Sequence, residues 1–385
     1  MTNIMSVHLN DKNPSIDVTL VFFINFIAKM SKLYSIQVLR GLAAVAVVID
    51  HVTHYMHKSF SGESWIYSSN IYNVGGFGVD LFFCISGFIM VITTYNKPSG
   101  MTESISFLNK RFTRIYPTYW FYCILTLALP FILYGKTDLL SKYSATFLTQ
   151  SFLLLPAKIA ENSFSPFLGQ GWTLQYELYF YIVFALSMLA VSGWKVIALS
   201  SFIILFMLAS SSFTYPNEYI NYLISNPIVV DFVLGMIVAQ VYLTLKQRGV
   251  ALQVKTIILI LVSLLSLVSL LVMERTQVSR VVLFGVPSSL IVLAFSLCEI
   301  NNKGFLSKIL IQSGEASYTI YLAHMAFIWF AIKNAHYLEG INPDVSIFIC
   351  SIAICLASYI MYLAVEKQIT NYLVSFRRKR RKLAS

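Results

Sequence analysis

Two residues that can carry charge or exchange a proton stand inside a stretch that is otherwise typical of a membrane-spanning helix. The stretch LRGLAAVAVVIDHVTHY, residues 39–55, contains Arg40 and, eleven positions later, His51. Cations and titratable groups are rare and costly inside a span, so by default they indicate function. Eleven helical residues turn through about 1100°, which places both side chains on one face roughly 16 Å apart. The spacing predicts a cationic group near one membrane surface and a proton-handling group toward the other.

The chemistry that suits such a histidine is general acid and base work beside a carboxylate. Glu177, in the stretch GWTLQYELYFY, is the carboxylate that we expect to tune His51, and Asp80 is expected to orient the site. A histidine in that setting can take the proton of an attacking hydroxyl or carry an acyl group covalently for a moment. Both routes stay open at this point.

Basic residues predict a second, separate layer. Guanidinium groups bind phosphates through paired hydrogen bonds, so Arg40, Arg111 and Arg114 are suited to a phosphate-bearing donor. Structural explanations exist for single residues: Arg40 can snorkel to lipid head groups, and His324 can bond only a neighbouring carbonyl. They explain the combination of Arg40, His51 and Glu177 poorly, because several costly residues would have to be retained independently.

Composition identifies the elements that must hold these residues. The chain is 57% hydrophobic and only 12% charged, with a mean hydropathy of +0.71, whereas soluble domains are roughly 25% charged. We therefore predict an all-helical, polytopic membrane protein, and apolar runs of about 20 residues give ten candidate spans. They lie near residues 36–57, 74–95, 116–135, 172–192, 195–213, 224–246, 254–273, 280–298, 316–333 and 343–366.

The distribution of Lys and Arg predicts the orientation. Basic residues concentrate on segments that are cytoplasmic if the N-terminus is inside, among them the tail RRKRRK at 377–382. Ten spans then leave both termini cytoplasmic. In this topology His51, Asp80 and Glu177 converge on an outer layer, while the arginines converge on the inner surface.

The ends of the chain and its charge allow narrower expectations. Residues 1–29 resemble no signal peptide and are expected to be an extension that is not native, with Met30 as the start. Residues 371–385 form a basic cytoplasmic tail that sets topology or binds anionic lipid. The net charge of +11 sits in loops flanking the membrane, so we expect no nucleic-acid partner. The cysteine spacing predicts no metal site.

Together the motifs are similar to those of a known family. The chain resembles the acyltransferase-3 family of integral membrane acyltransferases, especially bacterial O-acetyltransferases of O-antigen and exopolysaccharide. Arg40 and His51 fit the family's R-x10-H signature. The resemblance covers residues 30 to about 370. The other matching stretches are GGFGVDLFFCISGFIM at 75–90, KRFTRIYP at 110–117, GWTLQYELYFY at 171–181 and SYTIYLAHMAF at 317–327.

The resemblance implies a donor, an acceptor and roles. It implies acetyl-CoA as the cytoplasmic donor, with Arg111 and Arg114 at the CoA phosphates, and it makes Arg40 and His51 essential. Some relatives carry a fused extracytoplasmic SGNH domain, which we expect to be absent here. The acceptor would be a lipid-linked or growing surface polysaccharide, with glycan-assembly proteins as further partners, and the membrane would be the bacterial cytoplasmic (inner) membrane. Gln170, Trp172 and His324 are expected to contact it.

Two other classes of function compete with this one. In a transporter or flippase the same intramembrane ions would form a substrate pathway, although we see no inverted repeat between the halves. In a scaffold for glycan assembly, loss of His51 would have no effect. We recognise no feature that identifies the acceptor sugar, its hydroxyl position or the oligomeric state. The same holds for the choice between acetyl and another short acyl group.

Overall fold

The protein is all-helical apart from one short hairpin. The computed structural model describes residues 33–59, 62–69, 74–135, 142–160, 163–213, 215, 217–249, 257–258, 261–262, 279–298, 300, 302 and 304–384. The expected N-terminal extension lies outside them. The longer elements are α2 (Tyr34–Met56), α4 (Val74–Thr94), α5 (Met101–Tyr134), α8 (Trp172–Ala190), α9 (Trp194–Ser210), α11 (Val229–Arg248), α13 (Val286–Ser296), α14 (Phe305–Glu315), α15 (Ser317–Lys333), α16 (Pro343–Met361) and α17 (Lys367–Ala384).

Shorter elements connect these helices. They are η1 (His57–Ser59), α3 (Trp65–Ser68), α7 (Ala145–Phe152), the strands β1 (Lys158–Ala160) and β2 (Ser163–Phe164), η3 (Gly169–Gly171), α10 (Glu218–Ser225), the π-helical turns η4 (Val281–Gly285) and η6 (Tyr362–Glu366), and η5 (Ala335–Leu338). The two strands pair antiparallel. At eight residues, α7 is about 12 Å long and too short to cross a bilayer.

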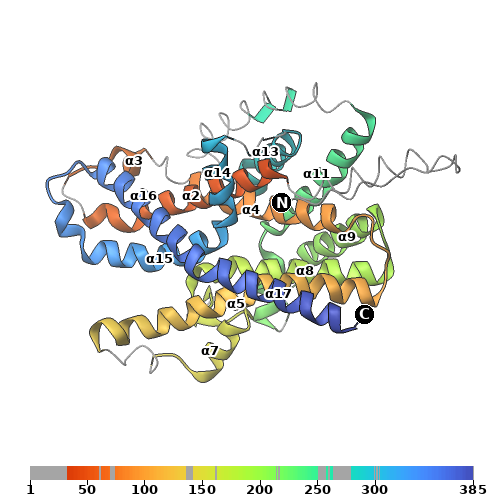
Figure 1. Cartoon of the computed structure of the whole chain (residues 1–385), viewed down its shortest axis with the longest axis horizontal. Coiled ribbons are helices and arrows are strands. Elements are labelled where there is room, and N and C mark those ends of the chain that lie inside the picture. Colours follow the sequence, from red (N-terminus) through yellow and green to blue (C-terminus); the bar gives the residue numbers. More distant parts are fainter. Residues whose placement is uncertain are drawn as a thin grey trace, which may run out of the picture.

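Helix α2, which carries Arg40 and His51, lies at the centre of the helix packing. It contacts α4, α13, α14, α15 and α16, and Figure 1 shows these elements around it. The helix is continuous from Tyr34 to Met56, so Arg40 and His51 are held at a fixed separation along one helix. Their separation along the axis is therefore roughly 16 Å, as the spacing predicts.

Glycines on α4 let it approach α2 closely. A Cβ atom at Gly78 would lie 2.7 Å from the carbonyl oxygen of Ala43, and one at Gly75 would lie 2.0 Å from Cβ of Asp50. Both approaches are closer than real Cβ contacts, so only glycine fits at these positions. The result is a tight seam between α2 and α4 that begins beside the residue preceding His51.

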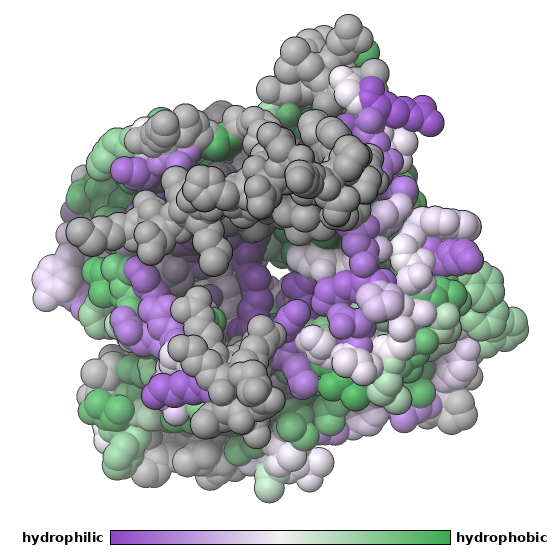
Figure 2. All heavy atoms as spheres, turned by 45° about the vertical axis from the view of Figure 1, so that its right-hand side comes forward, coloured by the Kyte–Doolittle hydropathy of each residue, from purple (hydrophilic) through white to green (hydrophobic). Residues whose placement is uncertain are grey.

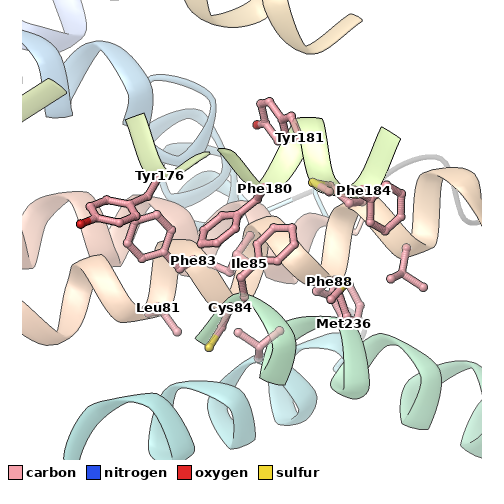
Figure 3. Packing of buried hydrophobic residues seen from close by; sticks show 14 of the residues in the cluster. Leu81, Phe83, Cys84, Ile85, Phe88, Tyr176, Phe180, Tyr181, Phe184 and Met236 are labelled. Carbon is pink, nitrogen blue, oxygen red and sulfur yellow. The ribbon is translucent and has the colours of Figure 1, made fainter. Parts of the chain in front are cut away.

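The main core joins α4, α8 and α11. Phe83 of α4 packs edge-on to Phe180 of α8, with ring centroids 5.6 Å apart, and Phe180 stacks on Phe232 of α11 at 4.1 Å. Figure 3 shows the apolar side chains of α4 and α8 meeting in this layer, with Tyr181 pointing to the other side of α8 from Phe180. This packing holds α8 so that Tyr181, itself buried, points toward α5, where its ring lies 6.0 Å from that of Phe107.

Several helices meet the requirements of a membrane span. By length and composition, five described helical segments do so: Tyr34–Ser59, Gly75–Thr94, Gly169–Ala190, Val229–Arg248 and Pro343–Phe376. Trp194–Ser210 and Val281–Ser296 are shorter apolar helices. Helices occupy nine of the ten predicted stretches, and the remaining one, 254–273, lies mostly outside the described residues. The fold class is confirmed, and the number of spans stays a prediction.

Helix α5 differs from the prediction. It begins at Met101 rather than near residue 116, so Arg111 and Arg114 lie on a helix and not in a loop. Its first half is too polar to register as an apolar run, but it buries one face, on which Ser104 donates a hydrogen bond to the carbonyl of Ala185 in α8. The helix therefore extends beyond the apolar run and carries the basic residues with it.

Helix α14 occupies a stretch that was expected to be a connection. It packs against α2 so closely that a Cβ at Gly314 would lie 1.8 Å from the carbonyl oxygen of Gln37. Gln37 is also the residue whose side chain accepts a hydrogen bond from Arg40, at 3.3 Å. Helix α14 thus supports α2 at the level of Arg40.

Candidate functional site

A cavity lined by charged and apolar side chains surrounds the arginine end of α2. Its volume is about 100 Å³, and it lies among α2, α4, α5, α8 and α15. All three predicted arginines line it together with Glu177. Its remaining lining residues are Val79, Phe82, Phe83, Ile85, Ser86, Ile89, Ile115, Thr173, Leu174, Tyr181, Ser317, Tyr318 and Tyr321. The sequence-based grouping of Arg40, Arg111 and Arg114 therefore corresponds to one cavity, which we call the arginine pocket.

Arg111 is held by aromatic rings and a hydroxyl. Its guanidinium carbon lies 5.2 Å from the ring centre of Phe107 and 5.4 Å from that of Tyr181, and Nη2 donates to Oγ1 of Thr93 at 3.2 Å. The cation–π contacts orient the guanidinium without neutralising it. The charge stays available to an anion in the pocket.

Glu177 belongs to the same pocket. Its carboxylate accepts hydrogen bonds from the hydroxyl of Tyr181, four residues along α8, and from Oγ of Ser86 on α4, the latter at 3.1 Å. We expected Glu177 near His51 because both seemed to lie in an outer layer. The structure does not bring them together, because Glu177 lies one and a half turns into α8, at the level of the arginines.

The pocket carries more positive than negative charge. Glu366, at the end of η6, accepts hydrogen bonds from the backbone N–H and hydroxyl of Thr319 and lies near Arg40 and Arg114. Three guanidinium groups against the carboxylates of Glu177 and Glu366 leave an excess of one positive charge. Figure 2 turns the side of the molecule with the C-terminus toward the reader, and that face is hollowed near its centre with hydrophilic residues around the hollow. The charge balance suits an anionic ligand.

A histidine pair marks the other end of α2. The rings of His51 and His324 lie 5.1 Å apart, nearly perpendicular. Nδ1 of each ring contacts the carbonyl oxygen four residues earlier, Val47 at 2.9 Å and Ile320 at 3.1 Å. A carbonyl only accepts, so both Nδ1 atoms carry a proton, and in a neutral ring Nε2 then presents a lone pair.

The two histidines differ in their access to the outside. The side chain of His51 is 31% exposed, whereas His324 is fully buried, and its Nε2 has no hydrogen-bond partner among the residues that the structure describes. A partly exposed base beside a buried one is suited to receiving a hydroxyl group from outside. We call these two residues the histidine pair.

The carboxylate beside His51 is Asp50. One of its oxygens lies 3.7 Å from Nδ1 of His51, on the side of the ring that carries the proton. Asp50 lies in the same predicted span, but no role was predicted for it. The only signal available in the sequence was that it directly precedes His51.

Tyr321 lies between the pocket and the histidine pair. Its ring lines the arginine pocket and is 5.9 Å from the ring of His324 and 6.1 Å from that of Phe82. Its hydroxyl accepts from Oγ1 of Thr173 at 2.9 Å and donates to the carbonyl of Gln170 at 3.0 Å. Phe82 and Tyr321 thus form a partition between the two ends of the site, which sequence reasoning missed although Tyr321 precedes His324 by less than one turn.

Of the residues expected to contact an acceptor, Gln170 and Trp172 make contacts within the protein. Nε2 of Gln170 donates to the carbonyl of Leu322 at 2.6 Å, which ties η3 to α15. The ring of Trp172 packs against that of Tyr176 at 5.9 Å and is half-buried. Of the three predicted residues, His324 is the one beside His51.

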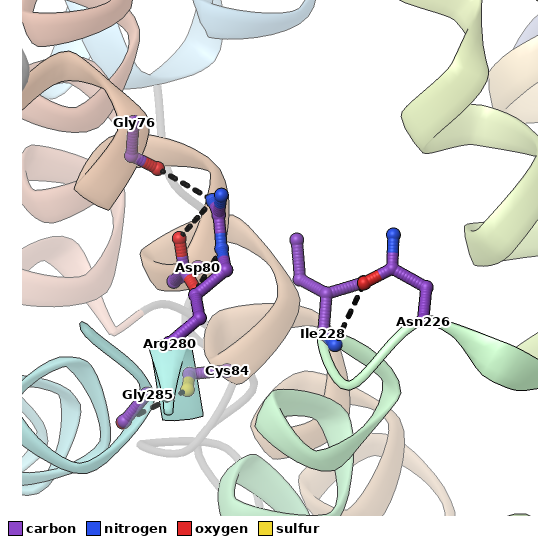
Figure 4. Close-up of polar contacts among 7 residues, drawn as sticks. All are labelled: Gly76, Asp80, Cys84, Asn226, Ile228, Arg280 and Gly285. Carbon is purple, nitrogen blue, oxygen red and sulfur yellow. Dashed lines mark hydrogen bonds and ion pairs between the residues drawn. The ribbon is translucent and has the colours of Figure 1, made fainter. Parts of the chain in front are cut away.

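Asp80 lies in a separate cluster. Both of its carboxylate oxygens bond Arg280, at 2.6 and 3.1 Å, and Arg280 also donates to the carbonyl of Gly76 at 3.3 Å (Figure 4). Asp231 of α11 lies next to this pair. The expectation that Asp80 orients His51 therefore does not match the geometry. Asp80 is two residues from Gly78, which faces α2, and two helical residues turn a side chain through about 200°.

Metal chemistry has no support in the part of the chain that the structure describes. No group of three His, Cys, Asp or Glu side chains there could hold a metal ion. The arrangement instead combines an anion-binding pocket with an imidazole whose Nε2 is free to accept a proton. Those are the requirements for transferring an acyl group from a charged donor to a hydroxyl.

Comparison with known proteins now decides the family. A family model described as an acyltransferase domain matches residues 33–363, which include both ends of the site. The chain belongs to the acyltransferase-3 family. As a member it is a multi-pass membrane protein related to acyltransferases, in agreement with the helices described above.

Two curated proteins illustrate the family. The chain is 27% identical over 304 residues to the exopolysaccharide production protein ExoZ of Rhizobium meliloti (strain 1021), covering 77% of this chain and 90% of ExoZ. It is 26% identical over 345 residues to the acyltransferase MdmB of Streptomyces mycarofaciens, covering 81% and 82%. Both similarities are distant but extend over most of each protein.

Proposed function

We propose that this acyltransferase-3 protein is a membrane O-acetyltransferase that moves an acetyl group from acetyl-CoA to a hydroxyl of a cell-surface glycan such as O-antigen or exopolysaccharide. The observation that carries the proposal is the arrangement along α2. One rigid helix supplies Arg40 to a pocket with excess positive charge and His51 to a histidine pair with free Nε2 atoms. A donor site and a base for the acceptor are thereby held at a fixed distance.

The arginine pocket is the proposed donor site. Arg111 and Arg114 bind phosphate groups of the donor, and Arg40, deeper along α2, completes the cationic lining. Glu177 holds Ser86 and Tyr181 in place and, through Tyr181, the ring on which Arg111 stacks. We thus assign Glu177 to the donor side. The charge distribution places this side in the cytoplasm and both termini with it.

His51 is the proposed base. Its Nε2 takes the proton of an acceptor hydroxyl as the hydroxyl oxygen attacks the thioester carbonyl carbon. The new C–O bond forms, the C–S bond breaks, and the departing thiolate receives the proton from His51. Asp50 and the carbonyl of Val47 hold the proton on Nδ1, which keeps Nε2 free and stabilises the imidazolium that forms.

A covalent route uses the same atom. Nε2 of His51 attacks the thioester carbonyl carbon, and the C–S bond breaks to release the thiolate. The hydroxyl oxygen then attacks the acyl-imidazole, the C–N bond breaks, and the hydroxyl proton passes by way of the released Nε2 to the thiolate. Radiolabelled acetyl-CoA without acceptor separates the routes. Label that stays on the protein, and is absent from His51→Gln, indicates the covalent route; release of CoA only when acceptor is added indicates direct transfer.

The relatives support the acceptor class. The name of ExoZ links it to exopolysaccharide production, and that of MdmB to acyl transfer. For the present chain we propose a lipid-linked or growing surface polysaccharide in a bacterial cytoplasmic membrane. The partly exposed side chain of His51 is accessible to such a substrate from outside.

The test compares surface polysaccharide from cells with the protein, without it, and with His51→Ala. We expect NMR to show an acetyl signal at one ring position that is lost in the second and third samples. The control is His54→Ala, since His54 is exposed and lies one turn further along α2. Full acetylation by His51→Ala would overturn the proposal, and so would gradient-driven glycan flux in vesicles without consumption of acetyl-CoA.

A further inference from the structure

A large apolar cavity lies beside the histidine pair and is used by neither end of the proposed reaction. It has a volume of about 730 Å³ and lies between α5, α15 and α16, with η5 at one end. Its lining is apolar except at a few positions. The residues are Tyr122, Leu125, Leu129, Ala323, Ala326, Phe327, Phe330, Ala331, Asn334, Tyr337, Leu338, Cys350, Ala353, Ile354, Ala357 and Met361. We call it the apolar groove.

Small side chains create the groove. Ala323, Ala326 and Ala331 lie along one face of α15, and Ala353 and Ala357 lie on α16. Methyl groups leave the space between these helices and α5 unfilled. In Figure 1 the second half of α5, in yellow, runs apart from α15 and α16, in blue, toward the left of the view. The groove therefore follows from residue size together with the divergence of α5.

The surroundings determine what can occupy this space. Helix α16 belongs to the segment Pro343–Phe376, which is apolar and long enough to cross a membrane. A polar ligand in an apolar groove at membrane depth would leave its hydrogen-bonding groups without partners, which is costly. A hydrocarbon chain meets no such cost and gains contact along the groove.

The groove is connected to the proposed chemistry through α15. It begins at Ala323, which directly precedes His324, and extends to Asn334, roughly 16 Å further along the helix. Asn334 and Tyr337 lie at the far end, whereas Tyr122 lines the groove from α5 with its hydroxyl buried. The far end lies on the same side of the molecule as the last turn of α2, beyond His51 (Figure 1). A head group leaving the groove there emerges on the side toward which α2 continues beyond His51.

We propose that the apolar groove binds the hydrocarbon chain of a lipid-linked acceptor, so that the glycan head reaches the histidine pair. This inference rests on the proposed function and narrows its acceptor to a glycan that carries a lipid. A groove on the helix of His324 anchors the chain, while the hydroxyl that reacts remains in the polar region outside.

The test fills the groove and compares two acceptors. Ala326→Phe and Ala353→Phe are made in the full-length protein in vesicles and compared with Ala198→Phe, which adds the same ring to an exposed position of α9. One acceptor is an oligosaccharide attached to a long isoprenyl chain, and the other is the same oligosaccharide without lipid. The readouts are KM and kcat for each acceptor and the dissociation constant for CoA.

We expect KM for the lipid-linked acceptor to rise about tenfold or more in both groove variants, the factor that two buried methylene groups contribute. KM and kcat for the lipid-free acceptor, and the dissociation constant for CoA, should equal those of Ala198→Phe. That equality would also show that the groove variants are folded. Equal changes for the two acceptors would overturn the inference, and so would no change for either, the result expected if ordinary phospholipid fills the groove. In both cases wild-type transfer would leave the proposed function standing, whereas wild-type protein that acetylates neither acceptor would overturn both.

Discussion

The two ends of helix α2 are built differently. At the Arg40 end, three guanidinium groups and the carboxylate of Glu177 line a cavity, Glu366 lies near two of the arginines, and Arg111 is held in place by aromatic rings. At the His51 end two imidazoles are each held by a backbone carbonyl through Nδ1. The first end is suited to holding charge and the second to moving a proton.

The difference shows how one helix can serve two substrates. Because α2 is continuous, Arg40 and His51 stay roughly 16 Å apart and cannot act on the same atom. The partition of Phe82 and Tyr321 lies between them. A donor held by its phosphates must therefore extend its acyl end past this partition. Variants at the two ends should affect different kinetic constants.

The largest separable effect is expected at the arginine end. Arg111→Gln combined with Arg114→Gln removes two charge-assisted phosphate contacts and should weaken CoA binding about 100-fold. Isothermal titration with CoA measures it, with Lys110→Gln on the same helix as the matched control. Unchanged CoA affinity would show that these arginines serve membrane topology and do not bind the donor. The Arg40 end would then not be a donor site.

A smaller effect is expected at the buried member of the histidine pair. His324→Gln removes the Nε2 lone pair that has no partner in the protein, and KM for the glycan acceptor should rise about tenfold, the loss of one hydrogen bond. Steady-state kinetics with varied acceptor measures this, while CoA affinity stays constant. A change confined to CoA binding would show that the two ends are not distinct.

Asp80 belongs to neither end of α2, so we expect its substitution to change stability and not the kinetic constants. Asp80→Asn breaks its ion pair with Arg280, and we expect the protein to lose about 1–3 kcal/mol of stability with kcat and both KM values retained per folded molecule. Thermal unfolding in detergent micelles measures the loss. Glu103→Gln, which breaks the more exposed pair with Lys97, is the control and should cost less than about 1 kcal/mol. A fall in kcat without loss of stability would return Asp80 to the site.

Relations within one helix could be predicted from the sequence. The joint placement of Arg40 and His51 needs only the 3.6-residue period and a continuous α2. Glu177 and Tyr181 are also four residues apart on one helix, so their contact could have been found. The nine occupied spans follow from apolar runs in the same way.

One relation between helices could be predicted, the convergence of Arg40 on α2 with Arg111 and Arg114 on α5, but most could not. Depth in the membrane was inferred from where each span begins, but it does not determine which neighbour a side chain faces. Asp80 turns toward Arg280 because Gly75 and Gly78 occupy the face of α4 against α2. The partition by Tyr321 depends on how α15 packs beside η3, which no local pattern encodes.

The most direct test of the account is a single-turnover experiment on His51→Gln in vesicles. Radiolabelled acetyl-CoA and glycan acceptor are mixed rapidly, and bound donor and acetylated glycan are measured in the same samples as for wild type. We predict normal donor binding with transfer slowed about 10²- to 10⁴-fold, the usual contribution of a general base. Transfer at the wild-type rate, or loss of donor binding together with transfer, would contradict the division of labour between the two ends of α2.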